Sequence, residues 1–298
     1  MPRKFLIPIL LLLAALSAGA DPWSFAVVLD CRQKSKRAPG TYEGVLREIR
    51  GLSFNPEPKF PPIDFVVGAG DMMLTADDGY NWKLWLETFA GAEHKPWYLP
   101  VLGNHDAGDE KLIRRTILPS LKNAVGDDPE DYYADWKNVR VIVGTHLAKL
   151  ERAIASAPAS IDHIFIADHY PVFPRHAHIE EPGSRDIALW SVLLEHRERV
   201  RAYFCGHTHH YSRMRVANPR GLAATPDGFP DEEGGIYQID SGNAGRPSHG
   251  EKKCTVVLVR VDGKDLTFRA IQAPHDTPDS FVLRDRWTLP ASDSKPGK

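Results

Sequence analysis

Short polar motifs rich in Asp, Asn and His follow apolar runs at several places in this sequence. Gly103-Asn104-His105-Asp106, for example, comes directly after the apolar run Trp97–Leu102. Such a run predicts a buried strand, and in an open α/β sheet a site is built at the carboxyl ends of the strands. Asn offers a neutral oxygen ligand, and His can donate a proton near neutral pH. The motif therefore indicates metal or acid–base chemistry if other parts of the chain supply partners.

Four further apolar runs end in the same way, each with a metal-type ligand in the residues that follow. The candidate ligands at the five strand ends are Asp30, Asp71, Asn104, His169, and His207 with His209. The carboxyl ends of parallel strands lie at one edge of a sheet, so these side chains can converge although they are far apart in sequence. Mixed oxygen and nitrogen donors suit Mn, Fe or Zn better than Ca or Mg. Six ligands are too many for one catalytic metal and fit two metal ions that share a carboxylate.

In their order along the chain, these motifs resemble the signature of the calcineurin-like metallophosphoesterases. The matching motifs are Gly70-Asp71, Gly103-Asn104-His105-Asp106, His169-Tyr170-Pro171 and Gly206-His207-Thr208-His209. The stretch from His209 to Arg213 resembles the ending of the purple acid phosphatase-like branch. The ordered set is far more specific than any single motif.

The resemblance implies a role for each of these residues. The implied ligands are Asp30 and His209 for the first metal ion, Asn104, His169 and His207 for the second, and Asp71 as the bridge between them. His105 would be the general acid at the leaving-group oxygen, and Asp106 would orient it. Solvent between the two ions would attack phosphorus in line, so no covalent enzyme intermediate would form.

The first motif departs from the family pattern. Most members have Asp-x-His, whereas this chain has Asp30-Cys31-Arg32, and Leu74 stands where purple acid phosphatases have a metal-binding Tyr. Gln33 could add an oxygen ligand, or water could fill the place, while Arg32 could clamp a phosphate oxygen. We therefore expect a weaker or differently selective first metal site and no tyrosinate colour.

Two hypotheses of function follow from these motifs. The first is an exported hydrolase of small-molecule phosphoesters with a dinuclear centre of Fe, Mn or Zn, and the tail after His209 favours a monoesterase over a phosphodiesterase. The second is a metal- or ligand-binding protein of the same fold that has lost turnover through its incomplete first site. Retention of His105 argues for the hydrolase, because only turnover needs a general acid.

Further residues near the motifs are candidates for weaker or purely structural roles. Asn104 would also touch substrate, and His176, in a basic loop after His169, is either a substrate contact or, as we favour, part of a solvated loop. His163, inside a predicted strand, is interpreted as a core residue. Tyr211 and Arg213 are interpreted as packing behind His209. Cys31 and Cys205 are interpreted as buried thiols, with a disulfide between them as the alternative.

Strand and helix patterns alternate along the chain, with hairpins in the middle and at the end. Strands are predicted at 25–29, 63–67, 97–102, 132–136, 139–143, 161–167, 202–205, 236–240, 254–261 and 265–271, and helices at 41–49, 80–90, 110–125, 146–157 and after Ser184 as N-cap. This order predicts one α/β domain, residues 21–290, with two sheets covered by helices. The family resemblance makes this a four-layer α-β-β-α sandwich of two mixed β-sheets.

The N-terminus carries the pattern of a signal peptide. Arg3 and Lys4 precede the apolar run Phe5–Leu16, and small residues up to Ala20 predict cleavage after that residue. The run is short for a membrane anchor, which is the alternative. We therefore expect a secreted or periplasmic protein, and we expect the tail, residues 291–298, to be disordered.

Composition is that of an ordinary soluble globular protein, with 42% hydrophobic and 26% charged residues. Loss of Arg3 and Lys4 with the leader changes the formal net charge from −2 to −4. A mildly acidic surface gives no general affinity for nucleic acid or anionic membranes. An anionic substrate would therefore have to be held by a local site.

Overall fold

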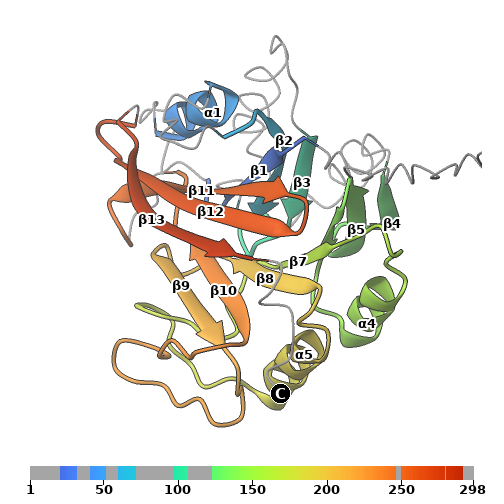
Figure 1. Ribbon diagram of the computed structural model, residues 1–298. Coiled ribbons are helices and arrows are strands. Elements are labelled where there is room, and N and C mark those ends of the chain that lie inside the picture. The colour runs from blue at the N-terminus through green and yellow to red at the C-terminus, as the bar shows by residue number, and fades with distance from the viewer. Residues whose placement is uncertain are drawn as a thin grey trace, which may run out of the picture.

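Two mixed β-sheets form the centre of the structure (Figure 1), a computed structural model that describes residues 21–31, 41–51, 60–71, 97–106, 123–245, 250–278 and 280–290. The first sheet has six strands in the order β13-β12-β11-β1-β2-β3. Its strands are β1 (Trp23–Val28), β2 (Ile63–Ala69), β3 (Trp97–Val101), β11 (Lys253–Asp262), β12 (Asp265–Pro274) and β13 (Val282–Leu289). β1, β2 and β3 are parallel, and β11 joins β1 antiparallel.

The second sheet has seven strands in the order β4-β5-β6-β7-β8-β10-β9. Its strands are β4 (Ala124–Asp128), β5 (Asp131–Trp136), β6 (Val139–Val143), β7 (His163–Ala167), β8 (Val200–Cys205), β9 (Tyr211–Val216) and β10 (Ile236–Ser241). The central strands β6, β7, β8 and β10 are parallel. Every residue of β7 and β8 is buried, as expected for central parallel strands that are covered on both faces.

The two sheets pack face to face through a core of aromatic side chains. Phe25 of β1 stacks on Phe65 of β2, with ring centroids 4.7 Å apart. The same Phe25 ring meets Phe165 of β7 edge-on at 5.2 Å, across the space between the sheets. Because strand side chains alternate between faces, the residues that do not enter this core must be covered from outside.

Helices cover the outer faces. α4 (Leu147–Ala155) and α5 (Ser184–Glu195) pack their buried side chains, such as Ile154 and Trp190, against the second sheet. α1 (Thr41–Gly51) lies on the side of the first sheet, at the opposite end of the molecule from α4 and α5 in Figure 1. The predicted four-layer sandwich of two mixed sheets flanked by helices is therefore confirmed. Among the helices that the structure describes, none combines the length and apolarity needed to cross a bilayer.

Predicted strands and helices within the described residues are present, with ends that differ by a few residues, but three details were wrong. The helix predicted at 110–125 was placed too far along the chain at its end, because Ala124 and Val125 belong to β4. The N-cap of α5 is Gly183 and not Ser184, and Asp186 completes the cap by accepting a hydrogen bond from the Gly183 N–H at 2.8 Å. Strands β9 and β13 were not predicted, because both are edge strands with many exposed or half-buried residues.

Several sequence predictions lie outside the described residues. These are the signal peptide (1–20), Arg32 and Gln33, Leu74, the helix at 80–90, most of the helix at 110–125 and the tail at 291–298.

Candidate metal centre

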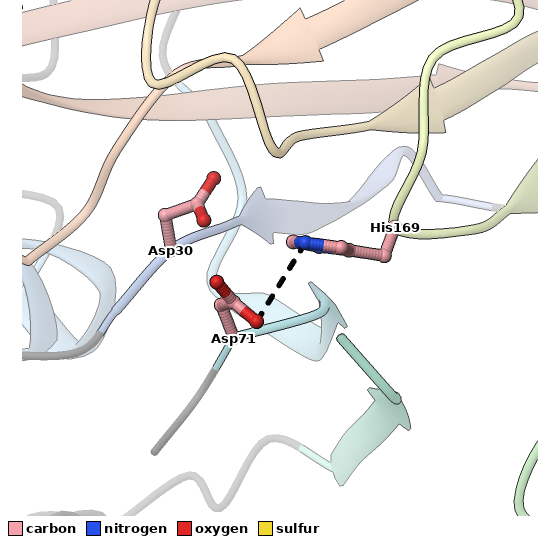
Figure 2. A group of neighbouring side chains, drawn as sticks. All are labelled: Asp30, Asp71 and His169. Carbon is pink, nitrogen blue, oxygen red and sulfur yellow. Dashed lines mark ion pairs between the residues drawn. The ribbon is translucent and has the colours of Figure 1, made fainter. Parts of the chain in front are cut away.

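The candidate ligands lie where the carboxyl ends of strands from both sheets meet. Asp30 and Asp71 follow β1 and β2 of the first sheet, while His169 follows β7 of the second. Figure 2 shows these three side chains pointing toward one another. One ligand atom from each lies within 4.8 Å of the others, and all three residues are buried. Asp30, Asp71 and His169 can therefore hold a metal ion together.

Asp30 belongs to a first group of contacts, with the loop that follows β8. Its Oδ1 lies 3.2 Å from Nε2 of His209, and its Oδ2 accepts a hydrogen bond from the backbone N–H of His207 at 3.0 Å. The carboxylate therefore fixes the loop of one sheet against the strand end of the other.

His169 is the centre of a second group of contacts. Its Nε2 lies 3.0 Å from Oδ1 of Asn104 and 3.2 Å from Nδ1 of His207. Asp71 stands beside this group, with Oδ1 3.6 Å from the same His169 nitrogen (Figure 2). The imidazole of His169 is fully buried, so its orientation is set by packing as well as by these contacts.

His105 stands at the mouth of the site and Asp106 beneath it. The His105 backbone N–H donates to Oδ1 of Asp71 at 2.9 Å, and its ring Nε2 lies 4.0 Å from Oδ2 of Asp71. The His105 side chain is 38% exposed, which leaves it accessible to a bound molecule. The buried Asp106 carboxylate accepts the Gly103 N–H at 2.8 Å, so it closes the turn that carries Asn104 and His105.

The backbone is strained at most of the candidate ligands. Among the described residues, seven non-glycine residues have a positive φ, which L-residues rarely adopt. Four of them are Asp30 (46°), Asp71 (51°), His207 (70°) and His209 (60°). Each such residue costs about 1–3 kcal/mol and persists only where the surrounding structure enforces it, most often at functional sites. The fold therefore holds these side chains in place at a cost in stability.

Two glycines allow the strand ends to approach one another. A Cβ built at Gly103 would collide with Asp71, both at its backbone N and at its Oδ1. A Cβ at Gly70, which has φ +98°, would collide with Nδ1 of His169. Any larger residue at either position would push apart the groups that form the site.

The electrostatic state of His207 suits metal binding. Burial, together with the neighbouring His169 and His178, lowers the pKa of His207 to about 4. His207 is therefore neutral at pH 7 and keeps a lone pair for a metal ion, as ligation requires. Together with two buried carboxylates and two more imidazoles, this donor set fits transition-metal ions.

Three buried polar residues that the sequence reasoning missed support the site from behind. Gln238 of β10 accepts the N–H groups of Val172 and Phe173, both at 2.9 Å, and so holds the loop after His169. Asp240 accepts the Thr208 hydroxyl at 2.6 Å, and burial raises the pKa of this carboxyl well above its usual value. Asn243 donates to the His209 carbonyl at 3.2 Å. The signal available was polar residues inside an apolar strand pattern, Ile236–Ser241.

The remaining candidates divide between the site and its surroundings. His176 lies beside His210, with ring centroids 5.6 Å apart, whereas His178 of the same loop lies against His207 at 4.6 Å. His163 is buried at the opposite end of β7 from His169, which agrees with its interpretation as a core residue. Cys31 and Cys205 are buried and free, so the alternative of a disulfide between them is wrong.

Tyr211 and Arg213 bond away from the site. The Tyr211 hydroxyl and the Arg213 Nε each donate to Oδ2 of Asp285, both at 2.9 Å. These two residues therefore hold β9 against β13. Their role is structural, as expected, but the contacts are to β13 and not behind His209.

Comparison with known proteins identifies the family. Residues 33–211 match the family model for calcineurin-like phosphoesterases, and the chain belongs to this family. The matched residues begin just after the divergent motif Asp30-Cys31-Arg32. A search of curated proteins found no match.

The solved structures that match this chain include two with a similar fold over most of its length. PhoD has a TM-score of 0.58 at 9% identity, covering 93% of this chain and 71% of PhoD. GAP50, described as the anchor in the inner membrane complex of Plasmodium, has a TM-score of 0.54 at 12% identity, covering 90% of this chain and 89% of GAP50. At such low identity these likenesses show the fold alone.

Proposed function

We propose that this chain is an exported phosphomonoesterase that works with two transition-metal ions. The observation that carries the proposal is the convergence of six candidate ligands from five strand ends, most of them held in a strained backbone conformation. Strain of this kind is maintained where the geometry of side chains matters to function. The leader at residues 1–20 supports export.

The contacts among the ligands are compatible with two metal ions. Asp30 contacts His209, whereas His169 contacts Asn104 and His207. One ligand atom each of Asp30, Asp71 and His169 lies within 4.8 Å of the others, so Asp71 can serve both groups. Asp30 and His209 would hold the first ion, Asn104, His169 and His207 the second, and Asp71 both. Ions held there would supply Lewis-acid activation of water and would neutralise charge on the phosphoryl oxygens.

His105 would donate the proton that the leaving alcohol needs. Its ring is partly exposed at the mouth of the site, and its backbone is fixed by the hydrogen bond to Asp71. Asp106 would act through the turn, because its carboxylate holds the Gly103 N–H and so sets the position of His105. A general acid placed in this way contributes about 10²–10⁴-fold to a rate.

A binding protein without turnover is the second candidate. Two facts favour it: the chain lacks the His of the family's first motif, and one relative of the same fold, GAP50, is described as an anchor. Against it stands His105, which metal binding alone does not need. A phosphodiesterase is the alternative within the first proposal, and the preference for monoesters rests on the purple acid phosphatase-like stretch after His209.

Metal content and turnover test the proposal together. Purified protein loaded with Mn, Fe or Zn is expected to hold about two metal ions per chain and to hydrolyse p-nitrophenyl phosphate faster than bis-p-nitrophenyl phosphate. His105→Ala is expected to lower kcat by about 10²–10⁴-fold with metal content unchanged. His196→Ala, at the half-buried C-cap of α5, is the control and is expected to behave as wild type.

A different result would overturn each part of the proposal. Hydrolysis of neither ester, or a His105→Ala variant as active as wild type, would overturn the catalytic claim. One metal ion per chain would overturn the dinuclear centre. An intact N-terminus in mass spectrometry of the exported protein would overturn cleavage after Ala20.

A further inference from the structure

A cavity of about 480 Å³ lies beside the candidate metal centre and shares Gly103 and Asn104 with it. Val101 of β3 and Leu102 also line it, and its other walls come from the second sheet and its helices. They include Thr145 from the β6–α4 loop, Asp168 and Tyr170 after β7, and Arg185 in the first turn of α5. The volume is within the range of sites for small molecules. Because Asn104 is a shared wall, a molecule whose phosphate lies at the metal centre can extend into this cavity.

The cavity wall places hydrogen-bond donors and acceptors side by side. Nη2 of Arg185, an exposed side chain, donates a long hydrogen bond of 3.5 Å to Oγ1 of Thr145. The Thr145 hydroxyl is also near enough to the Asp168 carboxyl to interact with it. The Asp168 carboxylate accepts the Tyr170 N–H at 3.1 Å. Thr145 therefore lies between a donor-rich guanidinium on α5 and an acceptor at the end of β7.

The balance of charge on the walls disfavours a second anionic group. Glu130, Asp131 and Asp168 supply three carboxylates against one guanidinium, that of Arg185. Lys149 compensates Asp131, at 2.8 Å, which still leaves two carboxylates against one cation. Like charges brought together in a site of this kind oppose binding. An alcohol that carries another phosphate is therefore a poor fit.

An apolar alcohol is also a poor fit. Asp168 is half-buried, so an apolar group would displace water from its carboxylate without replacing the hydrogen bonds. Such a group would also offer no acceptor to the Arg185 guanidinium. Hydroxyl groups both donate and accept, so a hydroxyl-rich molecule can bond to Asp168 and Arg185 at once. The Tyr170 side chain, 49% exposed, offers an apolar ring surface at the same wall.

We propose that this cavity binds the alcohol part of the substrate and selects a neutral, hydroxyl-rich alcohol of the sugar or nucleoside kind. The proposal rests on the proposed phosphomonoesterase activity, since it assigns the part of the ester that lies next to the phosphate. Thr145, Asp168 and Arg185 are then specificity-determining residues that the family motifs do not include.

Thr145→Val tests the proposal, because it keeps the shape of the side chain and removes the hydroxyl that lies between Arg185 and Asp168. The probes are glucose 6-phosphate, p-nitrophenyl phosphate and fructose 1,6-bisphosphate. We expect kcat/KM for glucose 6-phosphate to fall about tenfold or more while that for p-nitrophenyl phosphate changes by less than about twofold. Wild type is expected to use the bisphosphate less well than glucose 6-phosphate. Thr288→Val, at an exposed position of β13, is the matched control.

The outcomes separate this proposal from the proposed function. Equal losses on the two monoesters, an unchanged glucose 6-phosphate rate, or a preference for the bisphosphate would overturn the assignment of the cavity while leaving the phosphatase intact. Hydrolysis of none of the three esters would overturn the proposed function. In that case saturation-transfer NMR with glucose 6-phosphate decides the cavity: transfer to the sugar protons that Thr145→Val reduces supports it, and transfer that is absent or equal in both proteins overturns it.

Discussion

Strand β7 has a buried histidine at each end, and the two environments differ. His163, at the first residue, places its Nε2 2.9 Å from the Gly263 carbonyl, a single backbone partner. His169, just past the last residue, lies within 3.6 Å of side-chain atoms of Asn104, His207 and Asp71. Both are at most 1% exposed, so burial alone does not separate them.

The contrast extends to the neighbouring residues at each end. Near His163, Arg199 donates to the backbone carbonyls of Ala157, Pro158 and Ile161, which is how buried polar groups of a stable core are satisfied. Near His169, polar side chains meet other polar side chains, and two of the residues that carry them, Asp71 and His207, have a positive φ. The comparison teaches that the partners of a buried histidine, more than its burial, distinguish a functional group from a structural one.

The largest expected effect comes from exchanging the two histidines separately for alanine. His169→Ala is expected to lower metal content and to reduce phosphate-ester hydrolysis by at least about 100-fold, because the second group loses its central ligand. His163→Ala is expected to keep metal content and activity within about twofold of wild type and to lower the free energy of unfolding by about 1–3 kcal/mol. Metal analysis, kinetics and urea unfolding measure the three quantities. Loss of metal in His163→Ala, or full metal content in His169→Ala, would contradict the difference in role between the two histidines.

The pH dependence of stability tests the structural role of His163. Burial lowers the pKa of His163 to about 4, below its unfolded value near 6.5, and the charge of Arg201 adds to the shift. The folded state therefore binds fewer protons, so stability falls as pH drops from 6.5 to 4, by up to about 3 kcal/mol. His163→Gln lacks this titration. The difference in free energy of unfolding between wild type and His163→Gln is therefore expected to change by up to about 3 kcal/mol between pH 6.5 and pH 4. A difference that stays constant would show that His163 does not titrate in this way.

The smallest expected effect comes from Gly103, where the backbone lies close to Asp71. Gly103→Ala is expected to cost about 1–3 kcal/mol of stability and to lower activity, because the new Cβ would collide with Asp71. Gly263→Ala is the control, since a Cβ there meets nothing within 4 Å although φ is +58°. The control is expected to cost about 1 kcal/mol through its backbone alone, with activity unchanged. Equal activity in the two variants would show that close packing at Gly103 does not matter to the site.

Local sequence determined most of the strands and helices and the identity of the candidate ligands. Apolar runs that are buried on both faces, such as β1 and β8, are readable because nearly every position is apolar, with Ser24 and Arg201 as the exceptions. The ligands were found because each follows an apolar run and because the ordered motifs resemble those of a known family. Edge strands β9 and β13 were missed because they are rich in charged residues, and β13 has a single buried residue, Trp287.

Tertiary structure decided what local patterns do not contain. It decided which sheet supplies each ligand. The contact of Asp30 with His209 and the hydrogen bonds of Gln238 to the loop after His169 also join residues that are far apart in sequence. Asp30 and His207 have a positive φ, which Asp and His adopt more often than most residues, and a long-range hydrogen bond from the His207 N–H to the Asp30 carboxylate joins the two positions. Residue types and their order along the chain thus set which chemistry is available. The packing of two sheets set the distances at which that chemistry can operate, because those distances depend on contacts between segments that share no local sequence.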